Sequence, residues 1–395
     1  MDNDKSYQYI IGNYIFVVAL LSMIFSCFLE STTIPTVFPI FKNICYALEI
    51  FSVGIASIKL FFLSDYSVRY KLIILMVLFI LYITATIGKS RDLLDSFILV
   101  FASVNIKLEN IFKTYFYLFG TGLFVVITLS QTGILPNYVY FNKNSYRQSL
   151  GMGYTTILSS VVFYLLVALV CWSLFWKNKH SLLCSIPMFG ISYFIYKLTN
   201  TRTDLICSLL LILLFLISNS NFAKFNFSKT FLMISPSIIF LWSLYSTYFY
   251  NNMSRVWLVL NDLFSERLYL NNLVSNLYPA KLFGQYFTQY GNGYSTNIVT
   301  NYLFIDSSFL RVYFMNGIIP FIILYLIIQY SFYRIIKSGN NLNILLLFIF
   351  LITAFEGIFS TLFLVIGINC TLYILNYVFF NQGRISHSEE IFNGK

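Results

Sequence analysis

Residues 251–308 begin NNMSRVWLVLNDLFSERLYLNNL and end GNGYSTNIVTNYLFIDSS, a polar and aromatic stretch inside a chain of long apolar runs. An apolar run, residues 309–330, follows this stretch directly. A long polar segment between runs of bilayer length is typical of a membrane protein with a large loop on one side of the membrane. We therefore expect residues 251–308 to lie outside the cytoplasmic membrane and to form the working surface of the protein.

The composition of the whole chain also predicts a membrane protein. Of its 395 residues, 58% are hydrophobic and only 10% are charged, whereas a soluble domain carries roughly 25% charged residues. The apolar runs are continuous rather than alternating, which argues against a β-barrel. The predicted fold is an all-α polytopic membrane protein, with residues 1–395 in a single helical bundle.

About twelve runs approach the 20 or so apolar residues that a membrane span needs. They lie at residues 9–29, 43–63, 72–88, 93–106, 111–130, 155–176, 182–197, 205–217, 231–249, 309–332, 342–359 and 360–380. The last two divide one long run near residues 357–360. Two external loops then stand out, residues 131–154 and the large loop 251–308, which joins the ninth and tenth spans.

The basic residues of the short loops indicate the orientation, because cytoplasmic loops carry an excess of Lys and Arg. With the N-terminus inside, the inside loops hold Arg69, Lys71, Lys107, Lys113, Lys177, Lys179, Lys224, Lys229, Arg334 and Lys337, and the tail holds Arg384. An even number of spans places both termini in the cytoplasm. The formal net charge of +10 then reflects topology, and no nucleic-acid partner is expected.

Cysteine and histidine give no indication of a metal site. The six cysteines all fall in apolar segments without a CxxC pair, which makes disulfides and zinc improbable. The two histidines, His180 and His387, lie on the inside in this topology. No DxD motif occurs in the outer loops. We therefore expect metal-independent chemistry without a cofactor.

Arginine is concentrated on the predicted outer side. The outer arginines are Arg91, Arg147, Arg202, Arg255, Arg267 and Arg311, and most inside cations are lysines. A guanidinium group binds phosphate through two parallel hydrogen bonds, whereas lysine acts as a point charge. The distribution indicates an outward-facing site for an anionic or sugar-rich ligand, with chance in a small sample as the alternative.

Four short motifs in the outer segments carry the candidate chemistry. They are RQSLGMG (147–153), NTRTD (200–204), SER (265–267) and DSSFL (306–310), the last followed by Gly317. In the predicted topology Arg147, Arg202 and Arg311 stand at the outer starts of the sixth, eighth and tenth spans. Helix N-termini carry partial positive charge and unpaired N–H groups, so three such ends would suit a phosphate or diphosphate.

Each motif also has a purely structural interpretation. Asp306 and the serines after it could cap the tenth helix, and Asp204 could cap the eighth. Residues 254–277 have the pattern of one amphipathic helix, which could lie flat on the bilayer. Arg255 and Arg267 would then contact lipid headgroups.

These motifs resemble those of the Wzy-type polysaccharide polymerases, which belong to the superfamily that includes O-antigen ligases. The similar segments are RQSLGMGYTT (147–156), NTRTDLICSLLLILL (200–214) and IDSSFLRVYFMNGIIPFIILYL (305–326), and the resemblance covers residues 131–376. The related ligases carry a histidine at the head of the last motif, where this chain has Asp306. A histidine base is therefore excluded at that position.

The resemblance implies a glycosyltransferase in the bacterial cytoplasmic (inner) membrane. It would transfer a growing glycan from undecaprenyl diphosphate to a hydroxyl of a lipid-linked oligosaccharide repeat unit. Arg202 and Arg267 would stabilise charge on the leaving diphosphate, and Asp306, or else Glu266, would be the general base. The substrate-binding candidates are Arg147, Arg255, Arg311, Tyr290 and Tyr294, of which the tyrosines could stack on sugars or anchor at the interface. Expected partners are this lipid-linked oligosaccharide, membrane lipid, a chain-length regulator and a flippase.

Two other functions stay open. A flippase for lipid-linked oligosaccharides would also have about twelve spans, but it would need cations inside the membrane, and Lys59 and Lys197 lie at span ends. The carboxylates within apolar runs, Glu49, Asp95 and Glu356, are scattered along the chain, and we expect them to make structural hydrogen bonds. A ligase that passes the glycan to another acceptor is the closer alternative.

Overall fold

The computed structural model describes residues 2–142, 145–175, 181–219, 229–294 and 302–376. The first elements are α1 (Asp2–Glu30), α2 (Ile34–Val37), α3 (Ile40–Ile58), η1 (Lys59–Leu63), α4 (Val68–Gly88), α5 (Asp92–Ala102), α6 (Leu108–Gln131), β1 (Val139–Asn142), β2 (Ser145–Gln148) and α7 (Thr155–Ser173). The others are α8 (Ser181–Thr199), α9 (Arg202–Asn219), α10 (Lys229–Tyr248), α11 (Arg255–Leu263), α12 (Arg267–Leu277), α13 (Ser308–Arg311), η3 (Val312–Asn316), α14 (Ile318–Ser338), α15 (Asn341–Gly357), η4 (Leu362–Leu364) and η5 (Cys370–Tyr373).

Seven helices in the described ranges are long and apolar enough to cross a membrane, and they confirm the predicted class of helical membrane protein. They are Ile10–Glu30, Ile40–Leu63, Val68–Gly88, Leu108–Gln131, Thr155–Ser173, Lys229–Tyr248 and Ile318–Ser338. A shorter apolar helix, Asn341–Gly357, accompanies them. The number of twelve spans stays a prediction.

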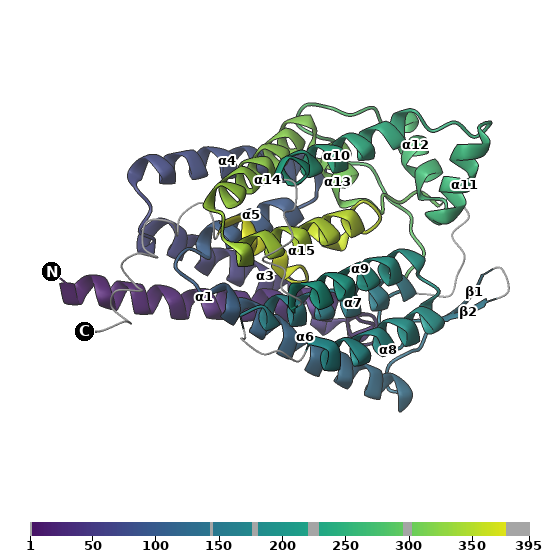
Figure 1. Cartoon of the computed structure of the whole chain (residues 1–395), viewed down its shortest axis with the longest axis horizontal. Coiled ribbons are helices and arrows are strands. Elements are labelled where there is room, and N and C mark those ends of the chain that lie inside the picture. The colour runs from purple at the N-terminus through teal and green to yellow at the C-terminus, as the bar shows by residue number, and fades with distance from the viewer. Residues whose placement is uncertain (1, 143–144, 176–180, 220–228, 295–301, 377–395) are drawn as a thin grey trace.

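The helices run mainly along the long axis of the molecule, as Figure 1 shows. Helix α1 begins at one end, whereas the β1–β2 hairpin, α11 and α12 gather at the opposite end (Figure 1). The hairpin is antiparallel and pairs Tyr140 with Arg147. Loops 131–154 and 251–308 thus lie at the same end of the bundle. The side of the membrane that this end faces stays a prediction from the charges, and positions 177, 179, 224 and 384 of that prediction lie outside the described residues.

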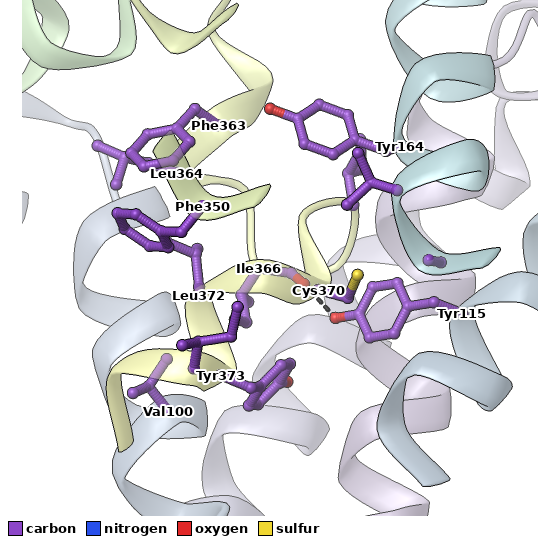
Figure 2. Close-up of a cluster of buried hydrophobic side chains, with 14 of the residues drawn as sticks. Val100, Tyr115, Tyr164, Phe350, Phe363, Leu364, Ile366, Cys370, Leu372 and Tyr373 are labelled. Carbon is purple, nitrogen blue, oxygen red and sulfur yellow. Dashed lines mark hydrogen bonds between the residues drawn. The ribbon is translucent and has the colours of Figure 1, made fainter. Parts of the chain in front are cut away.

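The predicted helix over the last apolar run is wrong for residues 360–373, which form turns that include η4 and η5, whereas residues 374–376 are helical and 377–380 lie outside the described residues. In a helix these carbonyl groups would accept hydrogen bonds from backbone N–H groups. Here they accept hydrogen bonds from side chains of earlier helices. Ser96 Oγ donates to the Leu364 carbonyl at 2.5 Å, and the Tyr115 hydroxyl donates to the Ile366 carbonyl (Figure 2). Irregular backbone at membrane depth is tolerated where protein satisfies its polar groups in this way.

The tenth predicted span is interrupted. Residues 308–316 form α13 and η3, and the long helix α14 begins only after Gly317. Gly317 has a φ of +109°, and a Cβ there would lie 2.3 Å from the Gly284 nitrogen. A Cβ at Gly284 would lie 2.0 Å from the Met315 carbonyl oxygen. The helix is therefore interrupted where the loop backbone at Gly284 lies in direct contact with the end of η3 and with Gly317. Arg311, expected in the first turn of the tenth span, lies instead at the end of α13.

The amphipathic segment 254–277 is two helices rather than the single predicted helix. Helices α11 and α12 meet at Ser265 and Glu266, whose φ values of 57° and 68° are left-handed. The backbone N–H of Glu266 donates to the Asn261 carbonyl at 2.8 Å, which closes the turn. Since the break reverses the chain direction locally, Arg267 starts a new helix that packs on α10.

Candidate functional site

A small polar cavity lies where the starts of α7, α9 and α12 meet the turns before α13 and after α15. Its volume is about 30 Å³, which is room for a small number of water molecules. The side chains with polar groups around it include Ser160, Thr201, Asp204, Arg267, Asp306 and Ser360. Three of the four sequence motifs, those at 200–204, 265–267 and 306–310, therefore contribute to one cavity although they are far apart in the chain.

An ion pair between Arg267 and Asp306 forms one wall of the cavity. Arg267 Nε lies 3.3 Å from Asp306 Oδ2, and the two side chains are 13% and 24% exposed. Asp306 does not cap the next helix, because the Ser307 hydroxyl accepts the N–H of Leu310 in that role. Burial raises the pKa of Asp306, while the positive charges of Arg267 and Arg311 act in the opposite direction. The ion pair thus orients the Arg267 guanidinium group at the cavity wall.

Asp204 forms a second acidic position on the opposite wall. It lies in the first turn of α9, where the helix N-terminus favours negative charge. Its carboxylate oxygen Oδ2 accepts a hydrogen bond from Ser160 Oγ at 3.2 Å, and the residue is 5% exposed. The Asp204 side chain therefore lines the cavity in addition to placing negative charge at the start of α9, where only a capping role was predicted.

Glu356 lies behind this wall, fully buried on α15. The Tyr164 hydroxyl donates to Glu356 Oε2 at 2.6 Å, and Figure 2 shows Tyr164 extending toward the C-terminal segment. The other oxygen, Oε1, has no hydrogen-bond partner among the described residues. Glu356 and Asp204 are close enough to interact electrostatically. The predicted structural hydrogen bond of Glu356 is present, but the carboxyl also adjoins the cavity.

Arg147, from the first motif, adjoins the cavity without lining it. Its Nε donates to the Thr199 carbonyl at 2.5 Å, which satisfies an end group of α8. Its guanidinium carbon lies 5.9 Å from the centre of the Tyr154 ring. Arg147 interacts electrostatically with Arg267 and Asp204, and burial lowers its pKa. The hairpin thus brings a second guanidinium group close to Arg267.

Three predicted site residues point away from the cavity. Arg202, Arg255 and Glu266 are exposed, and none of them lines it. In the first turn of α9 it is Thr201, Thr203 and Asp204 that face the cavity, so the helical period turns Arg202 outward. We predicted that three helix starts would each bring an arginine to one site. The helix starts at the cavity instead contribute hydroxyl groups and a carboxylate.

The remaining predicted residues surround the site at a greater distance. Arg311 is partly buried and acts on Asp306 electrostatically, and its Nε has no hydrogen-bond partner in the described ranges. Tyr290 is 52% exposed and pairs with Leu303 in an isolated bridge. Tyr294 donates its hydroxyl to the Glu30 carbonyl at 2.7 Å, and burial raises its pKa to about 12. Tyr294 is thus a structural tie between the large loop and α1.

Comparison with known proteins adds no relative. The chain matches no protein-family model, and neither curated proteins nor solved structures show a significant similarity to it. The fold and the cavity define a class: a helical membrane protein with a small polar cavity, lined by a guanidinium group and two carboxylates, toward the end of the bundle where α12 lies (Figure 1).

Proposed function

We propose that this cavity is the active site of a glycosyltransferase of the Wzy polymerase type. The enzyme transfers a growing glycan from undecaprenyl diphosphate to a hydroxyl of a lipid-linked repeat unit at the outer face of the membrane. One observation carries the proposal: Asp204, Arg267 and Asp306, from three of the motifs that resemble this family, line one cavity. The fold brings these charged residues, which are far apart in the sequence, to one cavity, as a shared site requires.

The chemistry requires positive charge where the diphosphate leaves. As the bond from the anomeric carbon to the diphosphate breaks, negative charge builds on the phosphate oxygen, and a fixed guanidinium group stabilises it. Arg267 is held for this role by Asp306 at 3.3 Å. Arg147 adds a second positive charge nearby. Arg202 is exposed at the start of α9, outside the cavity, and its proposed role is to bind the diphosphate at the membrane surface.

The size of the cavity favours a defined mode of binding. About 30 Å³ is too small for a diphosphate or a sugar ring. We therefore expect the diphosphate to bind at the mouth, with only the reacting hydroxyl reaching the carboxylates. In the core of the bundle Phe350, Phe363 and Tyr373 are close to fully buried (Figure 2). This closed packing supports a transferase over a flippase, which needs a polar path across the bilayer.

The test is a deletion strain in which lipid-linked glycans are extracted and sized. Single repeat units accumulating on the outer leaflet are the expected result, and they return to polymer when the wild-type chain is supplied. Repeats trapped on the inner leaflet would identify a flippase and overturn the proposal. Full-length polymer that stays on the lipid carrier would identify a ligase instead.

A further inference from the structure

Two carboxylates line the cavity, and a transferase needs one of them to accept the proton of the attacking hydroxyl. Asp306 and Asp204 differ in what surrounds them. Asp306 is bound to Arg267 at 3.3 Å and lies in the field of Arg311, so both neighbours stabilise its charged form. Burial raises the pKa of Asp306 despite these neighbours, but Arg267 already occupies one oxygen of its carboxylate.

Asp204 differs in that its carboxylate accepts hydrogen bonds from hydroxyl groups, those of Ser159, Ser160 and Thr203. Its hydrogen bond at 3.2 Å comes from a neutral donor, the Ser160 hydroxyl. Ser160 also interacts with Glu356, so it stands between the two carboxyl groups. Two neighbouring carboxylates repel each other, and a proton taken up by one of them relieves this repulsion. The side chain is nearly buried yet reaches the cavity wall.

Charged and titratable groups face Asp204 from every element around it. They are Arg147 of β2, Tyr164 of α7, Cys207 of α9, Arg267 of α12 and Glu356 of α15. The two arginines favour the anion of Asp204, and the charge of Asp204 acts in turn on Glu356. Glu356 is held by the Tyr164 hydroxyl at 2.6 Å. Ser160 thus connects Asp204 to a Glu356 side chain that is held in place.

We infer that Asp204 is the catalytic base of the proposed transfer and that Glu356 is a positioning residue that acts on it through Ser160. The inference rests on the proposed function. The acceptor hydroxyl oxygen forms a bond to the anomeric carbon while its proton moves to an oxygen of Asp204. The bond from that carbon to the diphosphate breaks, and its electron pair leaves with the undecaprenyl diphosphate. Asp306 acts only by orienting Arg267.

The test measures initial rates of glycan elongation over a range of pH, with the full-length protein in membrane vesicles and lipid-linked repeat units as substrate. Asp204→Asn is expected to lower kcat by about 100- to 10,000-fold, the usual loss of a general base, with KM changed little. Glu356→Gln, which keeps a polar group beside Ser160, is expected to stay active, whereas Glu356→Leu, which cannot hold Ser160, is expected to lower kcat with KM changed little. Asp65→Asn, an exposed carboxylate between η1 and α4, is the matched control.

Each result separates the inference from the proposed function. Vesicles with the wild-type chain that elongate nothing would refute the function itself. Elongation by the wild type together with a nearly normal rate for Asp204→Asn would refute only the inference. An Asp306→Asn variant that alone loses the acidic limb would make Asp306 the base. If Asp204→Asn does not accumulate, a normal kcat for Glu356→Leu overturns the inference.

Discussion

The Arg267 guanidinium group and the Asp306 carboxylate lie 3.3 Å apart, and their pairing joins the start of α12 to the turn before α13. Helix α12 is anchored again where Asn272 Nδ2 donates to the Thr247 carbonyl at 2.8 Å. The ion pair therefore joins two parts of the large loop, and Asn272 fixes α12 to the end of α10. A fixed guanidinium group does not have to reorganise during a reaction, which is the property expected of an electrostatic catalyst.

Replacing Arg267 with alanine is expected to lower the rate of glycan elongation by about 100- to 1,000-fold, the usual effect of removing one donor to a developing anion. Arg267→Lys should recover part of the rate, because lysine keeps the charge but not the planar group. Elongation in membrane vesicles, followed by gel separation of the glycans, measures the effect. Arg69→Ala, an exposed arginine at the start of α4, should leave the rate unchanged. Equal losses in both variants would contradict a specific role.

Asp306 predicts a pH dependence of stability. Burial raises its pKa in the folded protein above the value near 4 of a free aspartate. A raised pKa means that the folded state holds the proton more tightly than the unfolded state. Its contribution to stability is therefore complete below the unfolded pKa and is lost as pH rises through the folded pKa. Thermal unfolding in detergent between about pH 4 and pH 7 should show that the stability of the wild type rises relative to that of Asp306→Asn as the pH is lowered. A difference independent of pH would contradict this.

The contact between Gly317 and Gly284 predicts strong sensitivity to a methyl group. A Cβ at Gly317 would meet the Gly284 nitrogen at 2.3 Å, and its φ of +109° is unfavourable for alanine. We expect Gly317→Ala to destabilise the protein by at least about 2 kcal/mol, measured by thermal unfolding. Gly54→Ala is the matched control, since nothing lies within 4 Å of its Cβ position. A Gly317→Ala protein as stable as the control would show that the crossing can separate.

The bridge between Thr32 and Met152 predicts that cysteines introduced at these two positions would form a disulfide. Paired residues of an antiparallel bridge have Cα atoms about 4.5–5.5 Å apart, within the range that a disulfide spans. A Thr32→Cys and Met152→Cys double variant, with the exposed Cys184 replaced by serine, should therefore cross-link under mild oxidation. A shift in electrophoretic mobility that reductant reverses reports the bond. Thr32→Cys with Val68→Cys, at the start of α4, should not cross-link.

The class of fold was predictable because runs of bilayer length need no tertiary information. The error at residues 360–373 has a physical cause: hydropathy measures burial, and a buried irregular segment is as apolar as a helix. Whether its carbonyls are bonded by Ser96 and Tyr115 or by the segment itself depends on neighbours that hydropathy does not register. The break at Gly317 was missed for a related reason, since it depends on the backbone of Gly284.

The candidate site was predictable only in part. Arg267, Asp306 and the motif containing Asp204 were recognised because charged residues next to apolar runs are rare. The position of Arg202 outside the cavity was not predictable, because the side of α9 that faces the cavity depends on how the helix is rotated against α7. Glu356 was taken as a structural residue, since its proximity to Asp204 arises only when α15 packs on α9. Contacts between distant segments were thus the missing information.

The irregular segment at residues 360–373 also bears on how the chain is assembled. Its carbonyl groups at Leu364 and Ile366 accept hydrogen bonds from Ser96 and Tyr115, which are synthesised much earlier than this segment. Unlike a helix, this piece cannot enter lipid alone with its polar groups satisfied. It has to pack into a bundle that has already formed. In a chain truncated before this segment, the earlier helices would therefore lack the part of the core that it fills.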